Sequence, residues 1–180
     1  GHVWMHRHEP DRAMPLFQYV RNDKCRGNVW VDYDLTVTDK ASGRMWDTKG
    51  GRISPLVDRF DLSGRFVHES GKTLSYASFT PRTPHAKAPL LIWLHGGGEG
   101  GSDPTIPLLG NRATSYASDA IQAIFEGAYV LVPQCPGAWM HNAAGVMTQG
   151  KEDDVYNVPL MALIRDYVSA HPAIDKDRIY

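Results

Sequence analysis

LLIWLHGGGEGG, residues 90–101, is the segment that decides the fold of this 180-residue chain. Its first five residues form a continuous apolar run, which is typical of a strand buried on both faces in a parallel sheet. Pro89 precedes the run and marks its start. The glycines that follow His95 let backbone N–H groups approach a ligand with no side chain in the way. The segment therefore predicts a central strand with backbone donors at its carboxyl end.

The glycine turn predicts an oxyanion hole. In acyl transfer the tetrahedral intermediate carries negative charge on the former carbonyl oxygen, and N–H groups aimed at that oxygen stabilise it. Gly97 and Gly98 are the predicted donors. A turn that only reverses the chain or that cradles a phosphate is the alternative, although no Gly-Lys-Ser/Thr follows as it would in a Walker loop.

The sequence holds no nucleophile that matches this hole. The motif G-x-S-x-G, which presents the serine of many hydrolases on a sharp strand-to-helix turn, does not occur in residues 1–180. Ser102, Ser115 and Ser118 are the serines nearest the glycine turn, and none has the motif around it. We therefore expect none of them to act as a nucleophile.

Residues around the turn and after the next strand are candidates for supporting roles. We expect His95 to brace the turn by hydrogen bonds rather than to act as a base. Glu99 is expected to bind a neighbouring backbone group or arginine, or else to face solvent. Trp139 and His141 lie on a loop that should border the crevice above the sheet, so they are predicted to bind substrate. An ordinary packed position is the alternative for Trp139.

The two cysteines, Cys25 and Cys135, fit no paired spacing of metal ligands. Free thiols and a single disulfide both remain open for them. Cys135 with His141 could form a cysteine hydrolase pair, but its strand is the wrong one for a nucleophile, so a packed thiol is favoured. No metal and no organic cofactor is expected. A frayed terminus is favoured over a metal site for three N-terminal histidines, His2, His6 and His8.

Composition excludes several classes of partner. The net charge is −1, the sequence pI is about 6.8, and the basic residues are scattered rather than clustered. Such a chain lacks the basic surface that nucleic acids or anionic membranes require. No apolar run approaches the ~20 residues that span a bilayer. We therefore expect small or neutral partners, with no nucleic acid and no membrane.

The hydrophobic pattern divides the chain into two regions. Residues 29–38 alternate apolar and polar, a return strand is predicted at 44–48, and a hairpin is predicted at 65–69 and 73–79. From residue 90 the pattern becomes strand, helix, strand, helix, strand, which favours parallel strands joined by crossover helices. The later predictions are a helix at 116–125 capped by Gly127, a strand at 128–132 closed by Pro133, a helix whose inner side holds Leu160, Met161, Ile164, Tyr167 and Val168, and a strand opening after a turn at 175–178.

Three segments in this order, 94–101, 130–136 and 175–180, resemble α/β-hydrolase esterases related to polyhydroxyalkanoate depolymerases, feruloyl esterases and prolyl-oligopeptidase-like hydrolases. The resemblance implies an α/β fold in which residues 61–180 form the N-terminal half of an α/β-hydrolase domain. It also implies a preceding β-rich segment, residues 1–60. This segment is too short for a complete immunoglobulin-like module of ~100 residues, so only part of one is expected.

The resemblance further implies a serine esterase, that is, a hydrolase that cleaves carboxylic esters. In the family, the nucleophile elbow follows the segment that corresponds to 178–180, so the serine, the acid and the histidine of the triad are expected outside this chain. A small-molecule or polysaccharide-linked ester is the expected substrate. One alternative is a prolyl-oligopeptidase-like serine peptidase, and another is a non-catalytic binding or accessory fragment that needs a second chain.

An incomplete sheet has consequences for the isolated chain. It is expected to be inactive alone, and its exposed strand edge is expected to associate with a second chain or a C-terminal segment that completes the sheet. The resemblance favours an extracellular over a cytoplasmic location. The acyl and alcohol groups of the substrate stay open.

Overall fold

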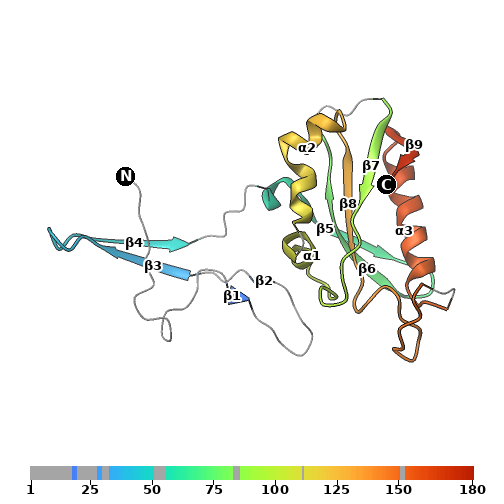
Figure 1. Cartoon of the computed structure of the whole chain (residues 1–180), viewed down its shortest axis with the longest axis horizontal. Helices are drawn as coiled ribbons and strands as arrows, with labels where there is room; N and C mark the ends of the chain where they lie inside the picture. The colour runs from blue at the N-terminus through green and yellow to red at the C-terminus, as the bar shows by residue number, and fades with distance from the viewer. Residues whose placement is uncertain are drawn as a thin grey trace.

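The main body of the protein is a five-stranded mixed sheet with helices on both faces (Figure 1). The structure, a computed structural model, describes residues 18–19, 28–29, 33–50, 56–82, 86–110, 112–150 and 153–180. The strands lie side by side in the order β5, β6, β8, β7, β9. Their bounds are β5 Asp61–Val67, β6 Thr73–Phe79, β7 Ala88–Ile92, β8 Tyr129–Gln134 and β9 Ile174–Ile179.

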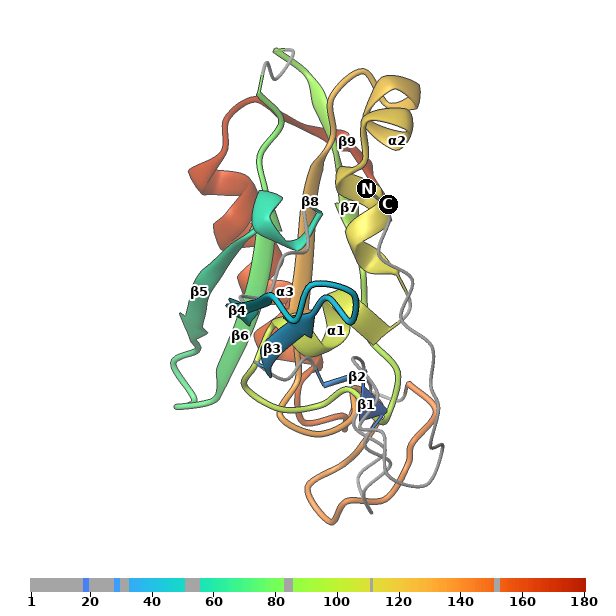
Figure 2. The same ribbon diagram turned by 90° about the vertical axis from the view of Figure 1, so that its left-hand side faces the viewer.

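Strand direction decides where a site can form. β5 and β6 form the predicted hairpin, β6 is antiparallel to β8, and β7 is parallel to both β8 and β9. Parallel neighbours require crossover connections, so the helices lie between these strands in the chain. α3 covers one face of the sheet and α1 and α2 cover the other (Figure 2). The carboxyl ends of β7, β8 and β9 therefore meet at one edge. The crossover elements are α1 Thr105–Gly110, the 3-10 helix η2 Ala113–Ala117, α2 Asp119–Ile124 and α3 Asn157–Ala170.

The predicted central strand is confirmed as β7, in which Leu90 is fully buried. Ala88 and Ile92 donate hydrogen bonds towards β9, so Pro89 between them faces β8. Since β8 pairs only from Leu90 onward, the missing N–H of Pro89 removes no ladder bond. The strand ends at Ile92 rather than at the predicted Leu94, whose side chain is 46% exposed.

Strand β8 runs through Pro133 to Gln134, so the prediction that Pro133 closes it is wrong. The Leu131 carbonyl accepts a hydrogen bond from the Trp93 N–H (3.0 Å), which means that the polar groups of Leu131 face β7. Pro133 faces the same side, where β7 has already ended. Its missing N–H therefore removes no ladder bond, and the strand stays paired with β6.

The helix predicted at 116–125 is divided into two short elements, η2 and α2. Ser118 ends η2 and caps α2, because its hydroxyl accepts a hydrogen bond from the Ile121 N–H (3.4 Å). The predicted apolar face is correspondingly incomplete, since Ile124 is 72% exposed. Gly127 follows α2 at φ +93°, a conformation that favours glycine and agrees with its predicted role as a cap.

Helix α3 is confirmed, with Pro159 in its first turn, where a missing N–H is tolerated. Most of the predicted inner side packs against the sheet, but Met161 is 46% exposed. Leu163 is buried instead, because it shares a helical stripe with Leu160 and Tyr167, whereas Met161 lies on the flank.

The turn predicted at 175–178 is a bulge within β9. Ala88 pairs with Ile174 and Leu90 pairs with Ile179, so residues 175–178 lie opposite Pro89 alone. The Asp177 N–H donates to Asp175 Oδ1 (3.1 Å) inside this bulge. The predicted strand therefore exists, but it begins before the turn rather than after it.

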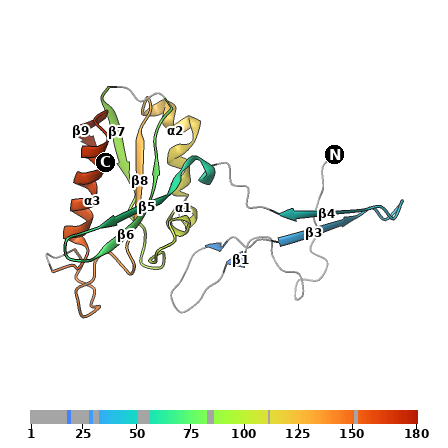
Figure 3. The same cartoon turned by 180° about the vertical axis from the view of Figure 1, so that it is seen from behind.

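Residues before the main sheet form two small antiparallel pairs, and the short 3-10 helix η1 Val57–Arg59 follows them. The predicted return strand is confirmed as β4, and its partner β3 begins at Tyr33 rather than at Val29. In Figures 1 and 3 the β3–β4 hairpin extends away from the five-stranded sheet. An immunoglobulin-like arrangement stays a prediction, and Cys25, His2, His6 and His8 lie outside the described residues. The pairs are β1 Gln18–Tyr19 with β2 Asn28–Val29, and β3 Tyr33–Thr38 with β4 Met45–Gly50.

None of the helices in the described ranges has both the length and the apolar character that crossing a membrane demands. No set of three or more His, Cys, Asp or Glu side chains in the same ranges is grouped to hold a metal ion.

Candidate oxyanion site

The glycine turn lies where β7 ends, at the edge where the parallel strands present their carboxyl ends. His95 is buried beneath it, with 5% of its surface exposed. His95 Nε2 accepts a hydrogen bond from the Cys135 N–H (2.9 Å), which assigns the ring proton to Nδ1. Nδ1 then donates to the Gly96 carbonyl (2.7 Å). Burial lowers the pKa of His95, which favours this neutral, doubly bonded form.

Glu99 holds the same turn from the other side. Its carboxylate is buried, and Oε2 accepts a hydrogen bond from the Gly96 N–H (2.8 Å). Its own N–H donates to the Gly96 carbonyl (3.2 Å). A Cβ placed on Gly110, the last residue of α1, would collide with the Glu99 carboxylate. Glu99 is therefore enclosed between the turn and α1.

Strand β8 fixes the far end of the turn. The buried Gln134 side chain donates from Nε2 to the Glu99 carbonyl (2.9 Å). The Gly101 N–H donates to the Cys135 carbonyl (2.9 Å), and Gly101 has φ +152°, at the limit of the region that favours glycine. The backbones of Gly100 and Gly137 approach so closely that a Cβ on Gly100 would collide with the Gly137 carbonyl.

Among the described residues, some backbone N–H groups of the turn are bonded to the protein, and others are not. The N–H groups of Gly96, Glu99 and Gly101 all donate to protein acceptors, whereas those of Gly97 and Gly98 have no partner among the described residues. Gly97 is exposed, Gly98 is half-buried, and nothing lies within 4 Å of the position of a Cβ on Gly97. The two predicted donors are thus available to a ligand, as is the N–H of Gly100, which also has no partner among the described residues.

Trp139 lies behind His95 rather than over the turn. Its side chain is 9% exposed, and its ring centroid is 5.2 Å from that of His95. It packs in a core cluster with Leu74, Cys135, Leu160 and Leu163. Contact between Trp139 and substrate stays a prediction, while its packing against His95 supports the turn.

His141 lies in a separate hollow of about 310 Å³, which we call the Lys72 hollow. Its walls come from the β5–β6 turn, the loop between β8 and α3, and the start of α3. Gly137 links the hollow to the glycine turn, because it lines the hollow and also packs against Gly100. No hydrogen bond, ion pair or ring contact joins His141 to the turn within the described ranges, and its role in substrate binding stays a prediction.

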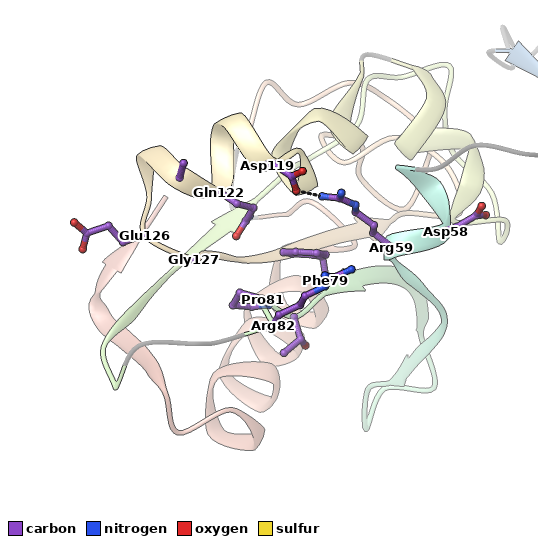
Figure 4. A pocket seen from close by; sticks show the side chains of 11 residues that line it. Asp58, Arg59, Phe79, Pro81, Arg82, Asp119, Gln122, Glu126 and Gly127 are labelled. Carbon is purple, nitrogen blue, oxygen red and sulfur yellow. Dashed lines mark hydrogen bonds and ion pairs between the residues drawn. The ribbon is translucent and has the colours of Figure 1, made fainter.

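A larger hollow, of about 630 Å³, lies at the other end of the sheet (Figure 4). It is lined by Phe79 at the end of β6 and by Gly127 just before β8. An ion pair between Arg59 and Asp119 (2.6 Å) crosses its wall. This hollow faces the amino ends of the parallel strands, so it is remote from the glycine turn despite its size.

Cys135 supplies backbone groups to the site and buries its side chain. The thiol is fully buried, and burial raises its pKa to about 11, although a hydrogen bond from the Gly137 N–H opposes this shift. A thiol in this state carries little thiolate at neutral pH, which disfavours the cysteine nucleophile considered from the sequence.

Three residues of the site were missed by sequence reasoning: Gln134, Gly110 and Gly137. Gln134 carried a signal, because it is the polar residue that ends an otherwise apolar buried strand. Gly110 carried none, since it is needed for the room it leaves to Glu99, and Gly137 carried none, since its carbonyl packs against Gly100, which is distant in the sequence.

Comparisons with known proteins give matches in structure only. Scans of the sequence against protein-family models and against curated proteins give no match. The crystal structure of a thermostable esterase is similar to this chain, with a TM-score of 0.69 and 23% identity over 94% of it. This chain covers 48% of that esterase's chain.

Two other solved structures are similar at a much lower level, too low to support any argument. They are an acylaminoacyl peptidase from Pyrococcus horikoshii (TM-score 0.40, 14% identity, 74% of this chain and 21% of that one) and a puromycin hydrolase mutant (TM-score 0.42, 14% identity, 80% and 22%). The esterase match and the strand order β5-β6-β8-β7-β9, with helices on both faces, lead to one conclusion: the chain has a partial α/β-hydrolase fold.

Proposed function

We propose that this chain supplies the oxyanion hole of a serine hydrolase that cleaves carboxylic esters. One observation carries the proposal: the N–H groups of Gly97 and Gly98 have no partner among the described residues, in a turn that His95, Glu99 and Gln134 hold from three sides. Donors that are fixed before the reaction stabilise developing charge without the energetic cost of reorganisation.

In the proposed reaction a serine attacks the ester carbonyl, the alcohol leaves, and water then releases the acid. The Gly97 and Gly98 N–H groups donate to the oxyanion of both tetrahedral intermediates. One such donor contributes about 3 kcal/mol, or roughly a hundredfold or more in rate. Because residues 1–180 hold no G-x-S-x-G, the proposal assigns the serine and its acid and histidine partners to residues outside this sequence.

An ester is proposed as the scissile group because the esterase is similar to this chain over 94% of its length. A peptide bond is the alternative, and the same experiment tests it. The full-length protein that contains this chain is assayed with p-nitrophenyl acetate and with a peptide p-nitroanilide. Its intact mass is measured before and after treatment with a fluorophosphonate.

We expect ester turnover that is lost when one fluorophosphonate adduct forms. If only the peptide p-nitroanilide is turned over, the proposed activity changes from esterase to peptidase. A protein with neither turnover nor adduct would overturn the proposal.

A pair of variants at Gly97 tests the donor itself. Gly97→Ala keeps the N–H, and its Cβ meets no atom within 4 Å, whereas Gly97→Pro removes the N–H. We expect kcat of the proline variant to be roughly a hundredfold below that of the alanine variant. Equal kcat values in two variants with equal thermal stability would show that Gly97 is not a donor.

A further inference from the structure

We propose that the Lys72 hollow binds a carboxylate carried by the substrate, on a small apolar or aryl group attached to the ester. The statement that this ligand is a substrate rests on the proposed function. The statement that the hollow binds a small carboxylate does not. Three features support the proposal: the polar groups of the wall, the position of the hollow beside the glycine turn, and the bonds that hold its loop.

The polar groups that line the hollow are donors. Lys72 is half-buried and makes no ion pair within the described ranges; its Nζ lies 5.7 Å from the centroid of the Tyr156 ring. Asn142 Oδ1 already accepts from two backbone N–H groups (3.0 Å each), which leaves its NH₂ group to donate outward. His141 and Tyr156 line the same hollow.

No Asp or Glu lies among the residues that line the hollow. A half-buried ammonium with a wall of donors and no carboxylate favours an anion over a cation. The rest of the wall is apolar or backbone, contributed by residues such as Gly137 and Val155. A volume of about 310 Å³ is at the small end of ligand pockets, which suits one ring or a short chain that ends in an anion.

The position of the hollow connects it to the proposed reaction. Gly137 lines the hollow and packs directly against Gly100 of the glycine turn. Both features therefore lie at the carboxyl ends of the neighbouring strands β7 and β8. An ester whose carbonyl oxygen binds at Gly97 and Gly98 can extend its distal group along Gly137 towards Lys72.

The loop that forms the hollow is held in place before any ligand binds. The Thr148 hydroxyl donates to the buried carboxylate of Asp154, and the Thr148 N–H donates to the Met140 carbonyl (2.9 Å). The Val155 N–H donates to the His141 carbonyl (2.9 Å). A wall that is already ordered binds a small group with less loss of conformational entropy.

The test uses the full-length protein and two pairs of esters that differ only by a carboxylate. In the first pair phenyl acetate is neutral, and 4-acetoxybenzoate carries the carboxylate on its alcohol side. In the second pair methyl benzoate is neutral, and monomethyl terephthalate carries the carboxylate on its acyl side. We expect one of the two pairs to respond, namely the pair whose carboxylate reaches the hollow. In that pair Lys72→Met should lower kcat/KM for the anionic ester about fivefold and change kcat/KM for the neutral ester less than about twofold. Lys72→Arg should retain the preference, and Lys176→Met, which removes an exposed lysine from the β9 bulge, should change neither rate.

Binding of benzoate gives a second readout that needs no turnover. We expect benzoate, and not benzyl alcohol, to shift the amide NMR signals of Gly137, Ala143 and Gly145, which line the hollow, and Lys72→Met to abolish the shifts. Neutral ester turnover with no Lys72 dependence in either readout would overturn this inference and leave the proposed function standing. If no ester is turned over but benzoate still shifts the amide signals in a way that depends on Lys72, the proposed function is overturned and the carboxylate site stands.

Discussion

The carboxylate of Glu99 fills the space that a Cβ on Gly110 would occupy. The same carboxylate accepts the Gly96 N–H at 2.8 Å, so the glycine that ends α1 makes room for the group that holds the glycine turn. The relationship couples the end of α1 to the site through packing.

Substitution of Gly110 by alanine should act through Glu99. We expect Gly110→Ala to displace the carboxylate and to lower the free energy of unfolding by about 1–3 kcal/mol, because the Gly96 bond is lost and the contact is overpacked. In a Glu99→Ala background the same substitution meets no carboxylate, so its cost should largely disappear. Urea unfolding of both single variants and the double variant measures this coupling. Strictly additive costs would contradict it.

His95 should contribute to stability through its two hydrogen bonds. His95→Ala leaves the buried Cys135 N–H without its acceptor, and we expect a loss of about 2 kcal/mol in the free energy of unfolding. His68→Ala is a matched control, because the side chain of His68 hydrogen-bonds only to Ser70 among the described residues. Equal losses in the two variants would argue against a bracing role for His95.

The stability of the fold should also depend on pH through His95. Burial lowers its pKa in the folded state, so the unfolded chain binds a proton more readily at this residue. The contribution of His95 is therefore complete above the unfolded pKa of ~6.5 and is lost as the pH falls from there towards the folded pKa. Unfolding experiments between pH 5 and pH 8 should show a smaller decline for His95→Ala than for the parent protein. A parallel decline in both would assign the effect to other groups.

The ion pair in the larger hollow should matter for stability and not for turnover. Arg59 donates to Asp119 (2.6 Å) and to the Ala117 carbonyl (2.7 Å), which connects η1 to the start of α2. Arg59→Met should lower the melting temperature more than Asp119→Asn, since it loses both bonds, and the Asp119→Asn effect should shrink in high salt. Ester turnover should stay at the parent level in both variants. A loss of turnover at unchanged melting temperature would indicate that the reaction takes place at the amino ends of the parallel strands, which contradicts the proposed site at the glycine turn.

Cys135 should be inert in the folded protein. Its thiol is buried and its pKa is raised to about 11, so thiolate is scarce at pH 8. Peptide mapping after treatment with iodoacetamide should find Cys135 unmodified in native protein and modified in guanidinium chloride. Rapid modification of Cys135 under native conditions would reopen the cysteine nucleophile as a hypothesis.

The sequence contained enough information for the parts of the site that are local. The apolar run, His95 and the glycines are contiguous, so their strand and turn were predicted together. A single helix was predicted at 116–125 because the apolar residues there are spaced to fit one helical face. In the structure the cap at Ser118 divides this segment into η2 and α2. Pro133 was misread as a strand end because the end of β7, which frees that side of β8, depends on tertiary structure.

The need for a glycine at position 110 could not be predicted, since it arises from the Glu99 carboxylate, a neighbour that only the fold provides. The contact between Gly137 and Gly100 depends on the fold in the same way. The roles of Trp139 and His141 in substrate binding stay predictions. Their places differ, however, because Trp139 is packed behind the turn and His141 lines a hollow.

Beyond the end of β7, Cys135, which directly follows β8, bonds not to a strand but to the His95 ring and to Gly101. The glycine turn is thus shaped by a segment that is remote from it in sequence. A protein engineer who grafts residues 94–101 onto another scaffold would obtain a loose loop. The portable unit has three pieces, namely the turn, the end of β8 through Gly137, and a helix that ends in a glycine. A library that randomises the loop after β8 should leave Gln134 unchanged and exclude proline at position 135, because the Gln134 side chain and the Cys135 N–H hold the glycine turn.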